Sequence, residues 1–368
     1  MNVLNSGIGN YVFCNGKKYS YFAGNNYLGM AGHPSVKAAS IEAVKKYGVN
    51  FSASRHTTGT ADIHLELEKQ LSLFKGKHDT VVFSSGYQGN GILLELLKPG
   101  YSAVFIDQFA HPSIASGIPR EISNIFHYNH CDTDHLEMLL QDFKGFRPLI
   151  ITDGVFALTG EIAPLDKIYS LAEKYNAILI VDDAHSTGIL GENGRGTVEH
   201  FKLGNSENIY QTETMSKALG GYGGFISGSL EITGLIREKS ATYQASTALP
   251  PPIAAAGIAS LEILRKEPEL RIKLLKRAGE LKKEITRLDF KTSEDNTPII
   301  PIMLSSLARA KELSRFLEEN GIIVPFMNYP VKLEFYILRI AVSTDHTDDQ
   351  AVLLVDMLKK WRDKNGTH

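Results

Sequence analysis

The sequence contains 368 residues with a formal net charge of −2 at neutral pH, and 43% of its residues are hydrophobic. This balance is typical of a globular protein and argues against nucleic acid or a membrane surface as the main partner. The two cysteines, Cys14 and Cys131, imply no disulfide framework, and the N-terminus shows no signal-peptide pattern. We therefore expect a cytoplasmic protein without stable membrane insertion.

Helical and strand patterns alternate along the first two thirds of the chain. Residues 35–47 and 61–74 are predicted helices. The predicted strands are 80–83, 103–106, 149–152, 177–181, 209–212 and 225–228. Short apolar strands separated by helices predict an α/β fold with a mostly parallel sheet between two layers of helices. Ligands in such sheets bind at the carboxyl ends of the strands.

A proline cluster at residues 250–252 interrupts this pattern and predicts the end of a large domain. The predicted organisation is an N-terminal segment (1–40), a large domain (41–250) and a small C-terminal α/β domain (251–368). Within the small domain, the predicted helices are 253–265, 270–288, 307–320 and 347–362. The predicted strands are 298–304, 322–325 and 336–341.

The strongest chemical signal combines a strand end with a lysine further along the chain. Asp182, Asp183 and His185 follow a buried strand, and Lys217 lies in a turn rich in hydroxyls and glycine. Lysine can carry pyridoxal 5'-phosphate (PLP) as a Schiff base, and an acid can keep its pyridine nitrogen protonated. Two alternatives stay open: a polar strand end with capping acids, and a metal-dependent hydrolase site built on Asp182, Asp183 and His185.

Three further positions could bind parts of a ligand. Residues 84–90 form a strand-to-helix turn whose N–H groups suit an anion such as a phosphate, although such a turn is also an ordinary helix cap. His111 follows a predicted strand and could stack on a planar ring, or it could be an ordinary loop histidine. Arg339 lies within an apolar strand and needs a partner, either a substrate carboxylate or a structural acid.

Two other patterns carry less weight. The glycines of residues 220–224 run into a strand and not a helix, which argues against a dinucleotide-binding loop. Histidines, acids and Cys131 gather in residues 127–135, but their spacing matches no standard zinc motif, so we predict no metal there.

Taken together, these residues resemble the α-oxoamine synthase family of fold-type I PLP-dependent transferases, which have an aspartate aminotransferase-like fold. The resemblance runs almost from end to end. It is most specific in four ordered motifs, at residues 25–29, 107–113, 181–188 and 214–217.

The resemblance implies a role for each matching residue. Lys217 would carry the cofactor, Asp182 would pair with its ring nitrogen, His185 would contact its phenolic oxygen and His111 would stack on its ring. The residues implied in binding the phosphate are Ser85, Gly86, Tyr87 and Thr214, with Ser246 and Thr247 reaching it across a dimer interface. Asn25 and Arg339 would bind the carboxylate of the amino acid substrate.

The resemblance also implies a reaction and its partners. Family members are homodimers that condense a small amino acid with an acyl-CoA or acyl-carrier thioester, with loss of carbon dioxide, to give a 2-amino ketone. The commonest bacterial member joins alanine to a pimeloyl thioester in biotin biosynthesis, and we expect that role here. Members that use glycine, serine or a longer acyl chain are the alternatives.

The sequence departs from the family pattern in four places. Ala157 replaces a serine that lies near the ring in relatives, and Asp153 replaces a frequent glutamate. The chain begins close to Asn25, so we expect it to lack the leading helix that helps to recognise the acyl group. Residues 327–330 do not match a Thr-x-Pro segment that contacts substrate in relatives.

Overall fold

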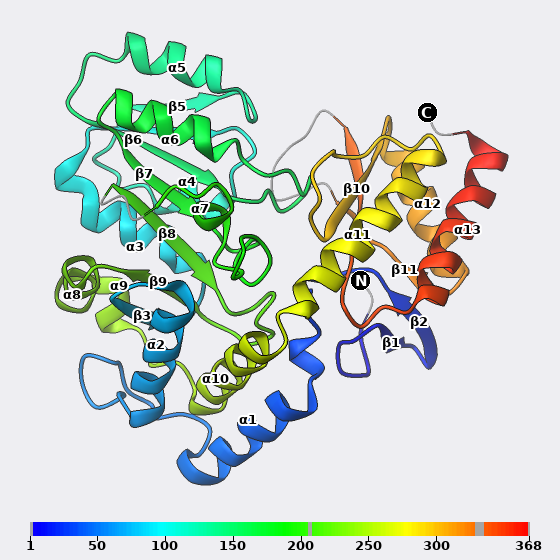
Figure 1. The fold of residues 1–368 in the computed structure, drawn as a ribbon, viewed down its shortest axis with the longest axis horizontal. Helices are drawn as coiled ribbons and strands as arrows, with labels where there is room; N and C mark the ends of the chain where they lie inside the picture. Colours follow the sequence, from blue (N-terminus) through cyan, green and yellow to red (C-terminus); the bar gives the residue numbers. More distant parts are fainter. Residues whose placement is uncertain (1–2, 205–207, 328–334, 367–368) are drawn as a thin grey trace. The chain divides into compact units, whose positions relative to one another are not determined.

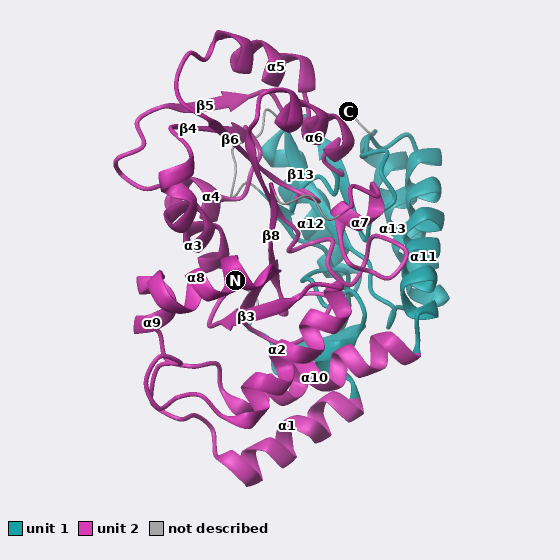
Figure 2. Cartoon of the chain, turned by 60° about the vertical axis from the view of Figure 1, so that its left-hand side comes forward, with its two compact units in different colours: residues 1–33, 157–161, 267–368 teal, residues 34–156, 162–266 magenta. Residues whose placement is uncertain are grey.

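The computed structural model describes residues 3–204, 208–327 and 335–366 (Figure 1). The chain forms two compact units, one of residues 34–156 and 162–266 and one of residues 1–33, 157–161 and 267–368 (Figure 2). This division differs from the predicted boundaries at residues 40 and 250.

Packing explains where the units divide. Helix α10 (Pro251–Lys266) belongs to the larger unit because it packs on α1 (Pro34–Tyr47) and α2 (Asp62–Lys75). The first residues belong to the smaller unit because β2 (Lys17–Tyr21) pairs with β11 (Ile322–Ile323), about 300 residues further along the chain. Such long-range pairing leaves no local mark on the sequence.

The larger unit is built on a seven-stranded sheet with the order β3-β9-β8-β7-β6-β4-β5 (Figure 1). The strands are β3 (Asp79–Phe83), β4 (Ala103–Asp107), β5 (Ile125–Tyr128), β6 (Pro148–Asp153), β7 (Ile178–Asp182), β8 (Ile209–Thr214) and β9 (Gly224–Gly228). Neighbours from β5 to β8 pair in parallel, and β9 is antiparallel to both β8 and β3. The predicted mostly parallel sheet is therefore confirmed, with β5 as an edge strand that the sequence pattern did not reveal.

Helices cover both faces of this sheet. They are α3 (Tyr87–Leu97), α4 (Pro112–Gly117), α5 (Thr133–Asp142), α6 (Leu165–Lys174), α7 (Thr197–His200), α8 (Leu230–Lys239) and α9 (Ala241–Ala245), with a 3-10 turn at Lys98–Gly100. One hydrophobic cluster joins the sheet to residues of α3, α4 and α8, and a second joins it to residues of α5, α6 and α7.

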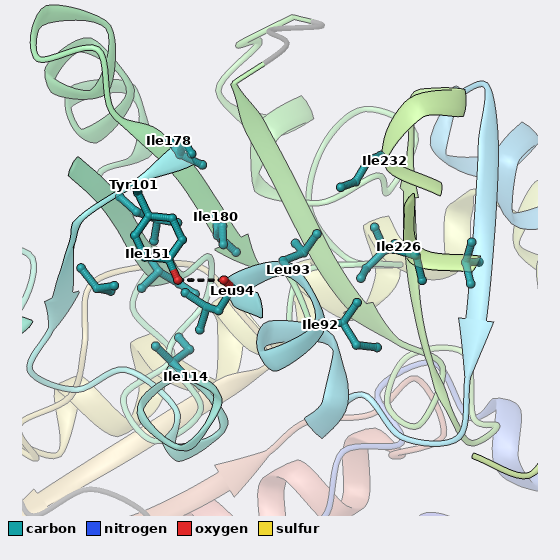
Figure 3. Packing of buried hydrophobic residues seen from close by; sticks show 14 of the residues in the cluster. Ile92, Leu93, Leu94, Tyr101, Ile114, Ile151, Ile178, Ile180, Ile226 and Ile232 are labelled. Atoms are coloured by element: carbon teal, nitrogen blue, oxygen red, sulfur yellow. Dashed lines mark hydrogen bonds between the residues drawn. The ribbon is translucent and has the colours of Figure 1, made fainter. Parts of the chain in front are cut away.

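Strand residues alternate between these two clusters, as the pleat requires. In β4, Val104 and Ile106 pack with α3, whereas Ala103 and Phe105 pack on the other face. Figure 3 shows the first cluster, where Leu93 of α3 lies among isoleucines of the strands. Both clusters are almost completely buried, so they hold the carboxyl ends of the strands in fixed positions.

The smaller unit contains two three-stranded sheets, ordered β1-β2-β11 and β10-β13-β12. Its remaining elements are β1 (Tyr11–Cys14), a 3-10 turn (Met30–Gly32), α11 (Glu269–Arg287), β10 (Ile299–Leu304), α12 (Leu307–Glu319), β12 (Phe326–Met327), β13 (Tyr336–Ala341) and α13 (Asp348–Asn365). Among the described residues, no helix combines the length and apolar character needed to cross a membrane.

Candidate functional site

A cavity of about 180 Å³ lies in the larger unit, at the carboxyl ends of its parallel strands. It brings together Lys217, Asp182, His185 and His111 with four of the predicted phosphate-binding residues, Ser85, Gly86, Tyr87 and Thr214. The lining residues are Ser85, Gly86, Tyr87, His111, Ser113, Asp153, Asp182, Ala184, His185, Thr214, Ser216 and Lys217. Loops that follow β3, β4, β7 and β8 therefore supply one common site.

Asp182 is the last residue of β7 and only 7% exposed. Its Oδ1 accepts a hydrogen bond from the N–H of Ala184 (3.0 Å), and its Oδ2 accepts one from Asn90 Nδ2 (2.7 Å). These two donors favour a carboxylate in this position, which is the form that a cationic ring nitrogen requires.

Asp183 does not share this site. Its carboxylate accepts hydrogen bonds from Thr197 Oγ1 (2.5 Å) and Gln211 Nε2 (2.6 Å) on the other side of the strand. Successive side chains of a strand point to opposite faces, which separates the two acids. Asp182, Asp183 and His185 therefore do not meet as a set of metal ligands, and the hydrolase hypothesis loses its geometric basis.

His111 precedes α4 and is held at both its backbone and its ring. Its N–H donates to Asp153 Oδ2 (2.8 Å), and its Nδ1 lies 2.8 Å from the hydroxyl of Ser113. Burial lowers the pKa of His111, so its imidazole is neutral at pH 7. The ring of Tyr87 meets it edge-to-face, with centroids 6.0 Å apart.

Gly86 and Thr214 form a close contact beside the first turn of α3. A Cβ added to Gly86 would lie 2.8 Å from Thr214 Cβ, so only glycine permits this close approach of the two segments. The Thr214 hydroxyl lies 2.8 Å from that of Ser216 and donates to the carbonyl of Gly223 (2.9 Å). Hydroxyl groups beside a helix start suit an anionic group such as a phosphate.

This set of groups fits PLP. The cavity combines a strand-end carboxylate for a protonated ring nitrogen, a neutral imidazole and a lysine. Ser85, Gly86, Tyr87 and Thr214 line the cavity at the start of α3, so backbone N–H groups and hydroxyls are available there for the phosphate.

Ser246 and Thr247 do not line the cavity. The Ser246 hydroxyl accepts a long hydrogen bond from Gln88 Nε2 (3.4 Å), and the carbonyl of Thr247 accepts one from Ser84 Oγ (3.0 Å). The Thr247 side chain is exposed. Both residues are thus attached to the turn that starts α3 and lie outside the lining of the cavity of their own chain.

Asn25 and Arg339 lie in the smaller unit and line a second cavity of about 520 Å³. The guanidinium of Arg339 donates to the carbonyl of Ala157 (2.6 Å), to Asn25 Oδ1 (2.9 Å) and to the hydroxyl of Tyr27 (3.1 Å). Arg339 is 6% exposed, and no ion pair involving it is found among the described residues. Within residues 3–204, 208–327 and 335–366, the acceptors of Arg339 are all neutral, which does not support the alternative of a structural acid.

Three polar residues in or beside the first cavity were not expected as site residues from the sequence: Ser113 and Asp153 line it, and Asn90 binds Asp182. Asn90 and Ser113 are fully buried polar side chains of α3 and α4, and Asp153 ends β6. The period-2 alternation of the strands contained the signal for Asp153. It places Asp153 and Asp182 on the same face as the isoleucines that precede them.

The cluster at residues 127–135 is only partly assembled in space. His130 and Cys131 meet Asp107, with His130 Nδ1 2.9 Å from Asp107 Oδ1 and the Cys131 sulfur 3.7 Å from His130 Nε2. The carboxylate of Asp107 already accepts the N–H groups of Phe109 and Cys131. It is therefore a capping group that organises the loop after β4.

Residues 328–330, which belong to the segment that does not match the family's Thr-x-Pro pattern, lie outside the described residues.

Comparison with known proteins gives one consistent result. Residues 18–358 match the family described as aminotransferase class I and II. An 8-amino-7-oxononanoate synthase from Alkaliphilus metalliredigens is 38% identical over 352 residues, which are 95% of this chain and 89% of the relative.

Two solved structures of related enzymes have the same fold as this chain. A serine palmitoyltransferase variant from S. paucimobilis, solved with PLP joined to myriocin, matches with a TM-score of 0.94 and 28% identity, covering 100% of this chain and 94% of that one. An 8-amino-7-oxononanoate synthase from Francisella tularensis matches with a TM-score of 0.79 and 28% identity, covering 94% and 98%.

Proposed function

Because the chain belongs to the class I and II aminotransferase family, and within it to the α-oxoamine synthases, we propose that it condenses a small amino acid with an acyl thioester and releases carbon dioxide. It is a PLP-dependent transferase of fold type I. The proposed activity is that of 8-amino-7-oxononanoate synthase, which takes alanine and a pimeloyl thioester. Curated relatives with that name match most of this chain at 36–38% identity, and this observation carries the proposal.

The residues of the first cavity would bind the cofactor. Bound PLP supplies an electron sink for the negative charge that develops on the α-carbon of the amino acid. Asp182 would accept the ring N–H and stabilise its charge, and His185 would donate to the phenolic oxygen. His111, neutral and held by Asp153, would lie on the ring face. Ser85, Gly86, Tyr87 and Thr214 would hold the phosphate.

Lys217 would have two tasks. It would bind the cofactor covalently between turnovers, and it would take the proton from the α-carbon of the amino acid during a turnover. Only a neutral amine can accept that proton. The half-buried position of Lys217 in the lining of this cavity supports this role, because it brings the amine to the cofactor site.

Arg339 and Asn25 would bind the carboxylate of the amino acid. In the described part of the chain the buried guanidinium has only neutral acceptors, so its positive charge can still attract an anion. Its planar fork can hold a carboxylate through two parallel hydrogen bonds. The same contact would orient the group that leaves as carbon dioxide.

The working assembly that we propose is a homodimer in the cytoplasm. Ser246 and Thr247 would reach the phosphate in the partner's cavity, which agrees with their position outside the cavity of their own chain. Both cysteines are free, as in a reducing compartment. Mixing an inactive Lys217→Ala chain with an inactive chain changed at Ser246 and Thr247 should restore activity only if the site is shared between copies.

Release of free thiol tests the activity directly. The purified holoenzyme is given alanine, glycine or serine in turn, each with pimeloyl-CoA, acetyl-CoA or palmitoyl-CoA. Alanine with pimeloyl-CoA should give the fastest release, and Lys217→Ala should abolish it. If no pair releases thiol and carbon dioxide above the Lys217→Ala background, the proposed condensation is wrong.

A serine palmitoyltransferase-like activity is the second candidate. The serine palmitoyltransferase structure matches this fold with a TM-score of 0.94, against 0.79 for the synthase from Francisella tularensis, at equal identity. Faster thiol release with serine and palmitoyl-CoA than with alanine and pimeloyl-CoA would select it. Preference for glycine and acetyl-CoA would indicate a 2-amino-3-ketobutyrate CoA ligase.

A further inference from the structure

Two carboxyl groups lie side by side in the first cavity. Asp153 ends β6 and Asp182 ends β7, and the parallel register of these strands pairs the two residues directly. Neighbouring strands are about 4.8 Å apart, so two negative charges here would repel each other strongly. Such a pair is most stable with one charge and one proton. The hydrogen-bond donors and the burial of the two acids determine which of them carries the charge.

The two acids differ in their hydrogen-bond donors. Asp182 accepts from a side-chain amide, Asn90 Nδ2 at 2.7 Å, and from the N–H of Ala184 at 3.0 Å. In the described part of the chain, Asp153 accepts only from the N–H of His111, at 2.8 Å. Asp153 is also the more deeply buried of the two, with 3% exposure against 7%. Donors stabilise the charged form and burial destabilises it, so both differences assign the charge to Asp182.

The electrostatic surroundings of Asp153 agree with this assignment. Burial raises the pKa of Asp153 well above its usual value, and the negative charge of Asp182 raises it further. The other charged groups that act on it are Lys217 after β8, which lowers its pKa, and Asp107 at the end of β4, which raises it. The His111 backbone N–H before α4 also lowers it.

Asn90 is held so that its amide can act in only one orientation. It is fully buried in α3, and its Oδ1 accepts the hydroxyl of Thr212 (3.1 Å). Both hydrogens of Nδ2 are therefore directed away from β8. One goes to Asp182, and the other goes to Ser113 Oγ (2.9 Å).

The second of these bonds extends the chain of hydrogen bonds to His111. Because Ser113 Oγ accepts from Asn90, its own proton is available for His111 Nδ1, 2.8 Å away. The N–H of Ser113 points to the same nitrogen at 3.3 Å. An Nδ1 that accepts from two donors belongs to a neutral imidazole with its hydrogen on Nε2.

We propose that Asn90 is a positioning residue that sets the charges of this site. Through its two N–H groups it keeps Asp182 as the anion and His111 as a neutral imidazole, and it leaves Asp153 as the protonated acid of the pair. The inference rests on the proposed function for the identity of the ligand, a cationic heterocycle with an N–H that meets Asp182. The charge assignment itself follows from hydrogen bonds within the chain.

The first test compares the two acids in holoenzyme reconstituted with PLP. Asn mimics the neutral form of Asp and can still accept the N–H of His111. Asp153→Asn should therefore keep the PLP dissociation constant within about twofold of wild type. Asp182→Asn should weaken binding by about a hundredfold, because a charge-assisted hydrogen bond is lost. Equal losses in both variants would overturn the charge assignment.

The second test removes the positioning residue. Asn90→Ala should weaken PLP binding by about tenfold to a hundredfold and shift the pH at which the visible band of bound PLP titrates. Leu93→Ala is the control: Leu93 is equally buried in the same helix, belongs to the hydrophobic cluster and has no group that could donate a hydrogen bond to either acid. It should lower thermal stability while leaving the affinity and the titration unchanged.

The outcomes separate this inference from the proposed function. A wild-type protein that binds PLP and releases thiol, while Asn90→Ala titrates and binds PLP like wild type, would refute the role of Asn90 alone. If Asn90→Ala and Leu93→Ala changed the PLP affinity and the titration of the visible band to the same extent, Asn90 would have a structural role only. A wild-type protein that binds no PLP would refute the proposed function itself.

Discussion

The substitution Glu213→Gln gives the sharpest prediction about stability. Glu213 precedes Thr214 on β8, is 1% exposed and forms an ion pair with Lys75, which is also buried. Burial raises the pKa of Glu213 to about 7, and Asp183 contributes in the same direction, whereas Lys75 and Lys77 lower it. The strand end that carries Thr214 is thus stabilised by a carboxyl that titrates near neutral pH.

The sign of the pH dependence follows from this shift. A carboxyl with a higher pKa in the folded state holds its proton more tightly there. Its contribution to the free energy of unfolding is therefore largest below 4.5, its ordinary pKa, and falls until about pH 7. The loss is about 3 kcal/mol, since each pKa unit corresponds to about 1.4 kcal/mol.

Another buried group has the opposite effect on the wild-type profile. Burial lowers the pKa of His346 to about 4, so its contribution is present above 6.5, its ordinary pKa, and is lost as the pH falls toward 4. The two effects oppose each other between pH 4.5 and 6.5. Only the difference between wild type and Glu213→Gln isolates the carboxyl.

The assay is urea unfolding, followed by circular dichroism, at intervals from pH 4.5 to 7.5. The stability advantage of wild type over Glu213→Gln should shrink by about 3 kcal/mol across this range. A Lys75→Met/Glu213→Gln double variant controls for the lysine that the single change leaves without its acid. A difference that stays constant to within about 0.5 kcal/mol would refute the reasoning.

Three further predictions concern single side chains. Arg339→Lys should raise the KM for the amino acid by about tenfold to a hundredfold, because an ammonium cannot replace the planar fork, and leave the KM for the thioester unchanged; an unchanged amino acid KM would contradict the assignment. Gly86→Ala should weaken PLP binding by about tenfold, because the new Cβ would lie 2.8 Å from that of Thr214. Equilibrium dialysis measures this affinity, and a variant that binds PLP as tightly as wild type would contradict the prediction. Leu93→Ala should lower the free energy of unfolding by about 3 kcal/mol in urea titrations, and a loss below about 1 kcal/mol would show that the core around α3 can relax into the space.

Much of the larger unit could be predicted because its elements carry local patterns. The apolar run 149–152 lies within β6, the run 177–181 overlaps β7 from residue 178 onward, and the turn at 84–86 leads into α3. Residues that follow parallel strands meet at one edge of the sheet, so the group of Asp182, His111 and Lys217 could be expected. β5 was missed because its half-exposed residues lack a continuous apolar run.

The sequence by itself determined most of the elements, the PLP chemistry of Lys217 and Asp182 and the family, since these depend on residue type and spacing. Only the tertiary structure decided the partners of the charged groups. Asn90 is 92 residues from Asp182, and the neutral acceptors of Arg339 come from chain segments more than 180 residues away. The protonation of Asp153 likewise depends on strand register and burial. Local propensity carries no record of these contacts, because packing and hydrogen bonding between distant segments create them.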